Sequence, residues 1–242
     1  MTAHPEAPRS RRERPAKPAL TRAGIVAAAV EIMRAEGLGK VTMRRLAQEL
    51  DTGPASLYVY VRNTAELHAA ILDELLGTVE AAQDGGGWSE RLEAVLTSYT
   101  SVLFRHRGLA KAALVARPSG EHYLRLIETL LALLDEGGVP PGQAAWGVDL
   151  LLQYATATAA EHAPDERTGS RAGEWDALSG ALRGASGQSH PHVAGLSAEL
   201  LSGRPEARLA WGFRALIDGI LHTPVPAADG IDGPDGPDGT DG

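Results

Sequence analysis

Cysteine is absent from the 242 residues, and its absence removes several kinds of chemistry at once. Without thiols the chain forms no disulfide, offers no thiolate to zinc and has no cysteine nucleophile. Long apolar runs are missing too, since no segment approaches the roughly 18 uninterrupted apolar residues of a membrane helix. Residues 1–17 are polar and rich in Arg and Pro, and so lack the apolar stretch of a secretory signal. These absences predict a cytoplasmic protein with no membrane partner.

Patterns typical of catalysis or metal binding are also lacking. The histidines form no His-x-x-x-His pair on a predicted helix, and neither a Gly-x-Ser-x-Gly turn nor a glycine-rich phosphate loop occurs. His190 and His192 flank a proline and come nearest to a metal-binding pair, but two imidazoles in a loop fall short of the usual ligand set. We therefore predict no catalytic residue, no metal and no cofactor.

The two signs of charge are unevenly distributed along the chain. The net charge of −8 would disfavour nucleic-acid binding if it were spread evenly. Residues 1–72 instead carry 11 Lys and Arg against 7 Asp and Glu, a net of +4, whereas the remainder carries 12 against 24, a net of −12. A basic N-terminal third joined to an acidic remainder is typical of a DNA-binding head on a body with another task.

Apolar periodicity is helical along most of the chain, and no segment reads as a convincing strand, so the predicted fold is all-α. Residues 1–19 read as a disordered basic arm, 20–67 as a three-helix head, 68–222 as a helical-bundle body and 223–242 as a disordered acidic tail. The helix 64–82 connects head and body. The other predicted helices cover residues 22–36, 43–50, 54–60, 89–106, 109–116, 119–136, 142–162, 175–182, 192–201 and 205–221.

The head contains a helix-turn-helix pattern. Two short helices, 43–50 and 54–60, are joined by a three-residue turn in which Gly53 allows the tight bend. Ala47 is small where the two helices must approach closely, and Leu57 falls on the core side. Such a second helix enters the major groove of DNA. The residues predicted for its outer, DNA-facing surface are Ala55, Ser56, Tyr58, Val59 and Tyr60.

Cations next to this motif are predicted to contact phosphates. Arg44 and Arg45 stand at the start of a helix, whose positive end favours anions. The basic arm has two interpretations: a solvated tail, or a segment that follows DNA phosphates or enters the minor groove. In the second interpretation, the arm contributes Arg11, Arg12 and Arg14.

These segments resemble the TetR family of repressors. The likeness is carried by residues 41–50 (VTMRRLAQEL), 56–63 (SLYVYVRN) and 66–67 (EL). One position departs from the pattern: many members have a phosphate-binding lysine where this chain has Thr64, so the resemblance implies that the Thr64 hydroxyl contacts DNA and that one charge is missing. Segments of the body also look like the tetracycline-repressor subgroup, namely residues 88–92, 106–110, 116–118, 130–138 and 212–219.

The resemblance implies that the body dimerises and binds a ligand. Helices 142–162 and 205–221 of two subunits would form a four-helix interface, with 109–116 as the coupling element to the head. Residues Trp146, Leu150, Gln153, Tyr154 and Ala157 form a stripe on the first of these helices that would serve the interface or, alternatively, an intrachain core. By alignment, the ligand-binding residues are Leu103, His106, Arg117, Leu130, Gln153, Tyr154 and Glu161. Ala113 stands where the tetracycline repressor has its magnesium-holding histidine, which implies an apolar effector bound without metal.

The predicted function is therefore a ligand-responsive repressor that binds a palindromic operator in double-stranded DNA as a homodimer. The first alternative is a TetR-like DNA-binding regulator without a small-molecule effector, acting as an activator or through a protein partner. The second is an enzyme that has kept a vestigial head.

Overall fold

The computed structural model describes residues 19–81, 85–106, 108–115, 118–162 and 171–226, and over these residues the chain forms helices and no strand. The all-α prediction is confirmed. None of the helices in this described part is long and apolar enough to cross a membrane. The helices are α1 (Arg22–Glu36), η1 (Leu38–Lys40), α2 (Met43–Glu49), α3 (Pro54–Leu57), α4 (Thr64–Leu76), α5 (Trp88–Arg105), α6 (Leu109–Ala113), α7 (Glu121–Glu136), α8 (Pro141–His162), α9 (Arg171–Arg183), α10 (Pro191–Gly195), α11 (Ser197–Leu200) and α12 (Pro205–His222).

Capping side chains explain where the helices of the head begin. Thr21, Thr42 and Asn63 each accept a hydrogen bond from the backbone N–H three residues on, at 3.1, 3.1 and 2.8 Å. Each cap satisfies a donor that would otherwise have no partner in the first turn. Gly37 ends α1 with a φ of 89°, a conformation that strains any residue with a side chain.

Some helices are shorter than the sequence predicts. Helix α3 ends at Leu57 instead of residue 60, and α4 ends at Leu76 instead of residue 82. Beyond Leu76 the next three N–H groups each donate to the carbonyl three residues back, which tightens the backbone out of the α-helical path. The Thr78 hydroxyl also donates a hydrogen bond to the Leu75 carbonyl at 2.7 Å. The single helix predicted over 192–201 is broken into α10 and α11.

The head closes around a small apolar core. Ile25, Leu46, Leu57 and Val61 are fully buried there. Ala47 is buried as well, as expected for a small residue where two helices meet. Because Leu57 points inward from a helix of barely one turn, its neighbours on α3 are turned toward solvent.

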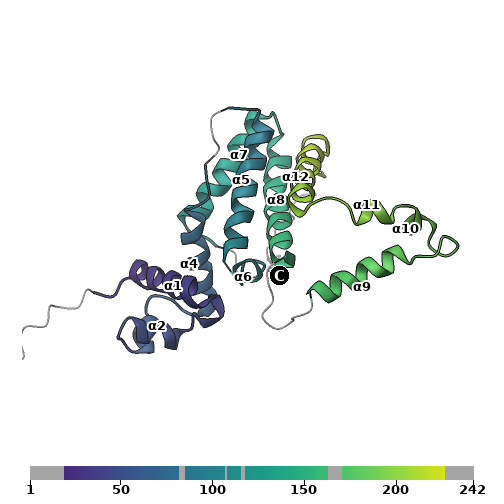
Figure 1. The fold of residues 1–242 in the computed structure, drawn as a ribbon. Helices are drawn as coiled ribbons and strands as arrows, with labels where there is room; N and C mark the ends of the chain where they lie inside the picture. Colours follow the sequence, from purple (N-terminus) through teal and green to yellow (C-terminus); the bar gives the residue numbers. More distant parts are fainter. Residues whose placement is uncertain (1–18, 82–84, 107, 116–117, 163–170, 227–242) are drawn as a thin grey trace, which may run out of the picture.

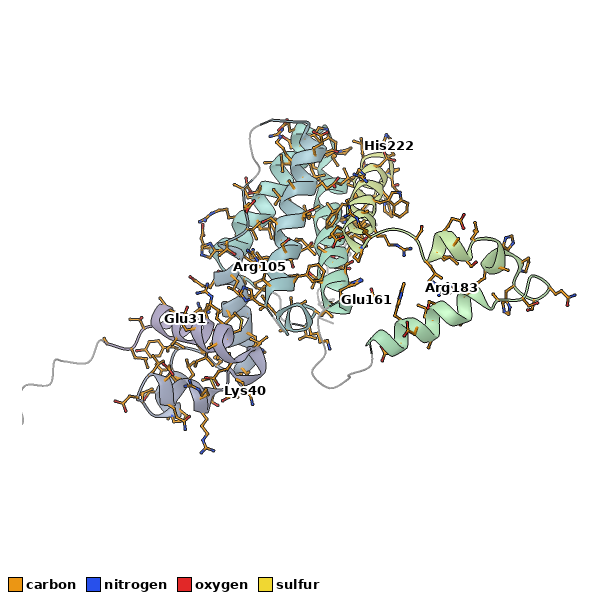
Figure 2. All side chains as sticks on the ribbon, viewed as in Figure 1. Glu31, Lys40, Arg105, Glu161, Arg183 and His222 are labelled. Carbon is orange, nitrogen blue, oxygen red and sulfur yellow. The ribbon has the colours of Figure 1, made fainter. Side chains whose placement is uncertain are left out.

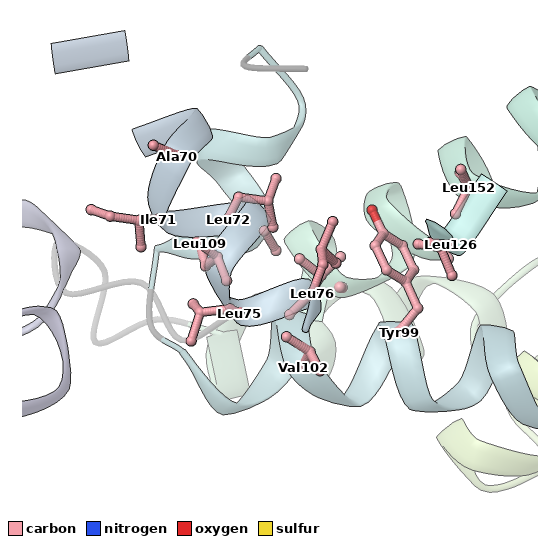
Figure 3. Close-up of a cluster of buried hydrophobic side chains, with 14 of the residues drawn as sticks. Ala70, Ile71, Leu72, Leu75, Leu76, Tyr99, Val102, Leu109, Leu126 and Leu152 are labelled. Atoms are coloured by element: carbon pink, nitrogen blue, oxygen red, sulfur yellow. The ribbon is translucent and has the colours of Figure 1, made fainter. Parts of the chain in front are cut away.

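The body is a bundle in which α5, α7, α8 and α12 stand side by side (Figure 1). Its apolar core is continuous with that of the head, because α4 contributes side chains to both. Figure 3 shows the shared cluster, with Ala70, Ile71, Leu72, Leu75 and Leu76 of α4 beside Tyr99, Val102, Leu109, Leu126 and Leu152 of the body.

Helices α9, α10 and α11 form an arm that stands away from the body (Figure 1). The three helices pack against one another, and α9 is longer than the predicted 175–182. The arm exposes large apolar side chains at Trp175, Leu178 and Leu196.

His68 on α4 makes the stability of the protein depend on pH. Its Nε2 atom is buried and has no hydrogen-bond partner among the described residues. Burial lowers the pKa of His68, and a hydrogen bond with the backbone of Val41 offsets this only in part. The unfolded chain therefore binds more protons than the folded one, and the free energy of unfolding falls as the pH drops below about 6.5. We expect His68→Gln, which does not titrate, to lessen this loss in urea unfolding at about pH 7 and pH 5.

The control for this prediction is His192→Gln, a change at an exposed position on α10. It should show the same pH dependence as the unmodified protein. Part of the dependence persists in both variants, because burial, together with Arg34 and Arg105, also lowers the pKa of His106. If His68→Gln loses as much stability on acidification as the unmodified protein, the ring of His68 is not a cause.

Candidate DNA-binding head and effector cavity

The outer face of α3 presents the residues predicted to meet DNA. Ala55 and Ser56 are exposed, Tyr58 is 52% exposed and Val59 is more so. Tyr60, just beyond the helix, is half-buried against the head core. The structure thus brings these five residues onto one short surface, with Leu57 anchoring it from behind.

The two arginines of α2 differ in their surroundings. Arg44 is exposed. Arg45 is held by two carboxylates, with Nη2 at 2.8 Å from Glu36 of α1 and Nη1 at 2.8 Å from Glu49 of α2. These hydrogen bonds raise the pKa of Arg45 above its ordinary value. Arg45 therefore ties α2 to α1 and is partly exposed, whereas Arg44 is the more exposed of the two.

The start of α4 is organised by Asn63 and Glu66. Asn63 is the capping residue, so Thr64 occupies the first helical position with an exposed side chain. Glu66 reaches back to accept hydrogen bonds from the backbone N–H of Arg62 at 2.9 Å and from its Nε at 3.1 Å. These bonds lower the pKa of Glu66. The remaining predicted DNA contacts, Arg11, Arg12 and Arg14, lie outside the described residues.

A cavity of about 400 Å³ opens between α4 and the body. Its walls are apolar and aromatic with a few polar groups, which is the usual composition of a small-molecule site. Helix α8 contributes the largest share of the lining. The lining residues are Leu72, Tyr99, Ala113, Leu114, Pro118, Tyr123, Asp149, Leu152, Gln153, Thr156 and Ala157.

A buried hydrogen bond crosses the wall of this cavity. The Tyr99 hydroxyl on α5 lies 2.7 Å from the Thr156 hydroxyl on α8, and both side chains are buried. Burial raises the pKa of Tyr99 to about 12, so the phenol stays neutral and able to donate. Figure 3 shows the Tyr99 ring standing out from its helix into the buried cluster. The pair offers a ligand one donor and one acceptor, beside the polar side chains of Asp149 and Gln153 in the same wall.

Of the six predicted ligand-binding residues that the structure describes, Gln153 alone lines this cavity, where its side-chain amide donates a hydrogen bond to the Asp149 carboxylate. Leu103 and Leu130 are buried in the core and expose almost none of their side chains. His106 caps the C-terminal end of α5, directly after Arg105. This end of the helix faces the head (Figure 2). The others are Tyr154, which packs edge-on against Phe213; Glu161, exposed near the end of α8; and Arg117, outside the described residues.

The alignment missed Tyr99 and Thr156, although the sequence carries a signal for both. Each is a polar residue on a helix face that is otherwise apolar, between Leu96 and Leu103 in one case and between Leu152 and Ala159 in the other. A polar group buried at such a position needs a partner. Their partners are each other. Among the described residues, no group of three or more His, Asp or Glu side chains is arranged to hold a metal ion.

Helices α8 and α12 pack closely and leave an aromatic surface outside. A Cβ added to Gly147 would lie 2.8 Å from Ile220, so the glycine allows the approach, and the Gln143 amide donates to the Ile220 carbonyl at 2.7 Å. Trp146 on α8 is 63% exposed and Trp211 on α12 is 68% exposed. The Trp146 side of the predicted stripe is therefore no intrachain core.

Comparison with known proteins matches the chain in both of its parts. Residues 25–71 match the domain described as bacterial regulatory proteins, tetR family, and residues 80–223 match the tetracyclin repressor-like C-terminal domain. The chain belongs to the TetR family. The transcriptional repressor DrrR1 of Streptomyces coeruleorubidus is 31% identical to this TetR-family chain over 84% of its length and 78% of DrrR1. TetR-family proteins are DNA-binding transcription regulators that act as dimers and bind small-molecule effectors.

Solved structures of other TetR-family regulators share the architecture. The Streptomyces transcription regulator SCO7704 is 58% identical, with a TM-score of 0.75 over 87% of this chain and 99% of that chain. Ligand-free ActR of Streptomyces coelicolor is 37% identical, with a TM-score of 0.73 over 84% of this chain and 95% of that chain. These similarities confirm the helix-turn-helix head with a helical C-terminal domain.

Proposed function

We propose that this TetR-family protein represses transcription by binding a palindromic operator as a homodimer, and that a small, largely apolar effector releases it. The observation that carries the proposal is the cavity of about 400 Å³ that has Leu72 of α4 in its wall. Helix α4 also completes the core of the head. An effector in the cavity therefore touches the same helix that sets the position of the DNA-binding surface, as a two-state switch requires.

On the DNA side, the exposed face of α3 supplies the base and sugar contacts. Tyr58 and Ser56 are the central readers in this proposal, with Ala55, Val59 and Tyr60 beside them. Arg44 is the leading phosphate contact, and Thr64 adds a hydroxyl at the start of α4. Arg45 takes part only by exchanging one of its two carboxylate partners for a phosphate. The basic arm contributes Arg11, Arg12 and Arg14.

A homodimer places two α3 surfaces on successive turns of one DNA face, which is why the operator is proposed to be palindromic. The aromatic surface of α8 and α12, with Trp146 and Trp211, is the proposed centre of the interface. The apolar side of the α9–α11 arm, which its own body leaves exposed, extends the surface available to a second copy. In the proposed dimer these side chains would be buried, which would explain why a single chain leaves them exposed.

The chemistry of the cavity suggests the kind of effector. Its leucines, alanines and tyrosines favour an apolar molecule, and Tyr99, Thr156 and Gln153 allow a few hydrogen bonds. A structure of ActR, 36% identical to this chain, contains actinorhodin. Actinorhodin is therefore a reasonable first probe for the cavity.

The test begins by enriching a duplex from a random DNA library with the protein itself. Fluorescence anisotropy then measures affinity for that duplex, and analytical ultracentrifugation measures how many subunits bind it. We expect saturable binding of one dimer to a palindrome, and release by actinorhodin or another compound from an aromatic metabolite panel. No sequence-specific binding at moderate salt would refute the proposal. Specific binding that no compound alters would favour the alternative regulator without an effector.

A further inference from the structure

The first turn of α7 is capped by a residue from another helix. Gly120 precedes α7 and has no side chain to offer. The carboxylate of Asp73 on α4, 50 residues earlier than its partner, accepts a hydrogen bond from the N–H of Tyr123 at 3.0 Å. Its negative charge also faces the positive end of a 16-residue helix. Asp73 thus does for α7 what a capping residue of its own normally does.

Two glycines make this approach of α4 to α7 possible. A Cβ added to Gly120 would lie 2.6 Å from Oδ1 of Asp73, a distance that real side chains do not adopt. One turn further along α4, a Cβ on Gly77 would lie 2.9 Å from the ring of His122. At each of these two contacts a glycine beside one helix leaves room for a side chain from the other: Gly120 for Asp73, and Gly77 for His122.

This contact lies between the cavity and the head. Leu72, which precedes Asp73 in α4, and Tyr123, whose N–H Asp73 holds, both line the cavity. At its other end, α4 is joined to the head through Glu66, which bonds Arg62 and lies 3.9 Å from Arg22 of α1. One rigid helix thus carries the cavity contact at Asp73 and the head contact at Glu66.

We propose that Asp73 is a positioning residue that couples the cavity to the DNA-binding head. Asp73 caps α7 and so fixes to α4 the turn that contains Tyr123. A ligand that moves this turn therefore also moves α4 and α3. The inference rests on the function proposed above for cavity and head. It differs from the sequence prediction of 109–116 as the coupling element. Helix α6 also packs against α4 and adds Ala113 to the cavity wall, and a Cβ on Gly108, just before α6, would lie 3.6 Å from Leu38 of the head.

Hydrogen–deuterium exchange with and without the enriched operator duplex tests this coupling without requiring an effector. In the unmodified protein, operator binding should change exchange at residues 119–126. In Asp73→Ala, the Tyr123 amide should exchange about ten-fold faster or more, since a charge-assisted hydrogen bond is lost. Operator binding should still protect the head of this variant, but residues 119–126 should no longer respond.

Three further variants make the result specific. Asp73→Asn keeps an acceptor and should keep the response. Glu74→Ala removes the adjacent exposed carboxylate and should behave as the unmodified protein. Gly120→Ala displaces the Asp73 carboxylate from the other side and should reproduce Asp73→Ala, which also covers the case of a poorly folded Asp73→Ala.

The outcomes separate this proposal from the proposed function. The coupling role is overturned if residues 119–126 of the unmodified protein ignore the operator, or if in Asp73→Ala and Gly120→Ala these residues still respond to the operator as they do in the unmodified protein. A protein that binds no operator refutes the proposed function, and the coupling role with it.

Discussion

Phe213→Ala is expected to lower the free energy of unfolding by about 3–5 kcal/mol, the range for truncating a buried phenylalanine. Phe213 is the largest of the fully buried side chains in the described part of the chain. Its ring meets Tyr154 of α8 edge-on, with centroids 5.5 Å apart, and so fastens α12 to the bundle. Because α12 also carries Trp211, loosening it should weaken the proposed dimer. Urea unfolding at one fixed protein concentration measures the first effect, and sedimentation equilibrium measures the second.

The chain contains its own control for this prediction. Its other phenylalanine, Phe104, is 40% exposed on α5. Phe104→Ala should cost clearly less, about 1–2 kcal/mol, since part of its surface is already hydrated. Equal losses in the two variants would mean that Phe213 does not seat α12 as described.

Tyr58→Ala is expected to weaken operator binding by about 30-fold or more, because a dimer loses two side chains that each contribute about 1–3 kcal/mol. About half of the Tyr58 surface is already exposed, so the free energy of unfolding should fall by no more than about 1 kcal/mol. Anisotropy titrations at one salt concentration measure the affinity. A titration over several salt concentrations should give an unchanged slope, because the lost group carries no charge.

Leu124→Ala is the matched control. Leu124 is 58% exposed on α7, comparable to Tyr58, but it lies on the body rather than the head. It should bind the operator as the unmodified protein does. Full affinity in Tyr58→Ala would exclude α3 as the surface that reads DNA.

Local chemistry made the head predictable. Thr21 and Thr42 cap the helices that directly follow them, since a capping bond joins residues three apart and needs no distant partner. The burial of Ala47 and Leu57 follows from helical periodicity in the same way. The boundary of α4 was less predictable, because apolar residues continue after Leu76 while the backbone has already tightened.

The cavity was harder to predict. Leu103 and Leu130 look on alignment like ligand contacts, yet both face the core. A rotation of one residue, about 100°, on a helix exchanges cavity for core, and sequence alone does not define this rotation. Tyr99 and Thr156 lie 57 residues apart, and their hydrogen bond exists only once α5 and α8 are packed.

The sequence by itself determined the helices, their caps, the helix-turn-helix pattern and membership of the TetR family, because all of these depend on residues close together in the chain. Only the tertiary structure decided which polar groups line the cavity, that Arg45 is held by Glu36 while Arg44 is exposed, and that Asp73 caps α7. The physical reason is the same in each case. These features are pairings across helices, and the packing of the bundle sets which side chains meet.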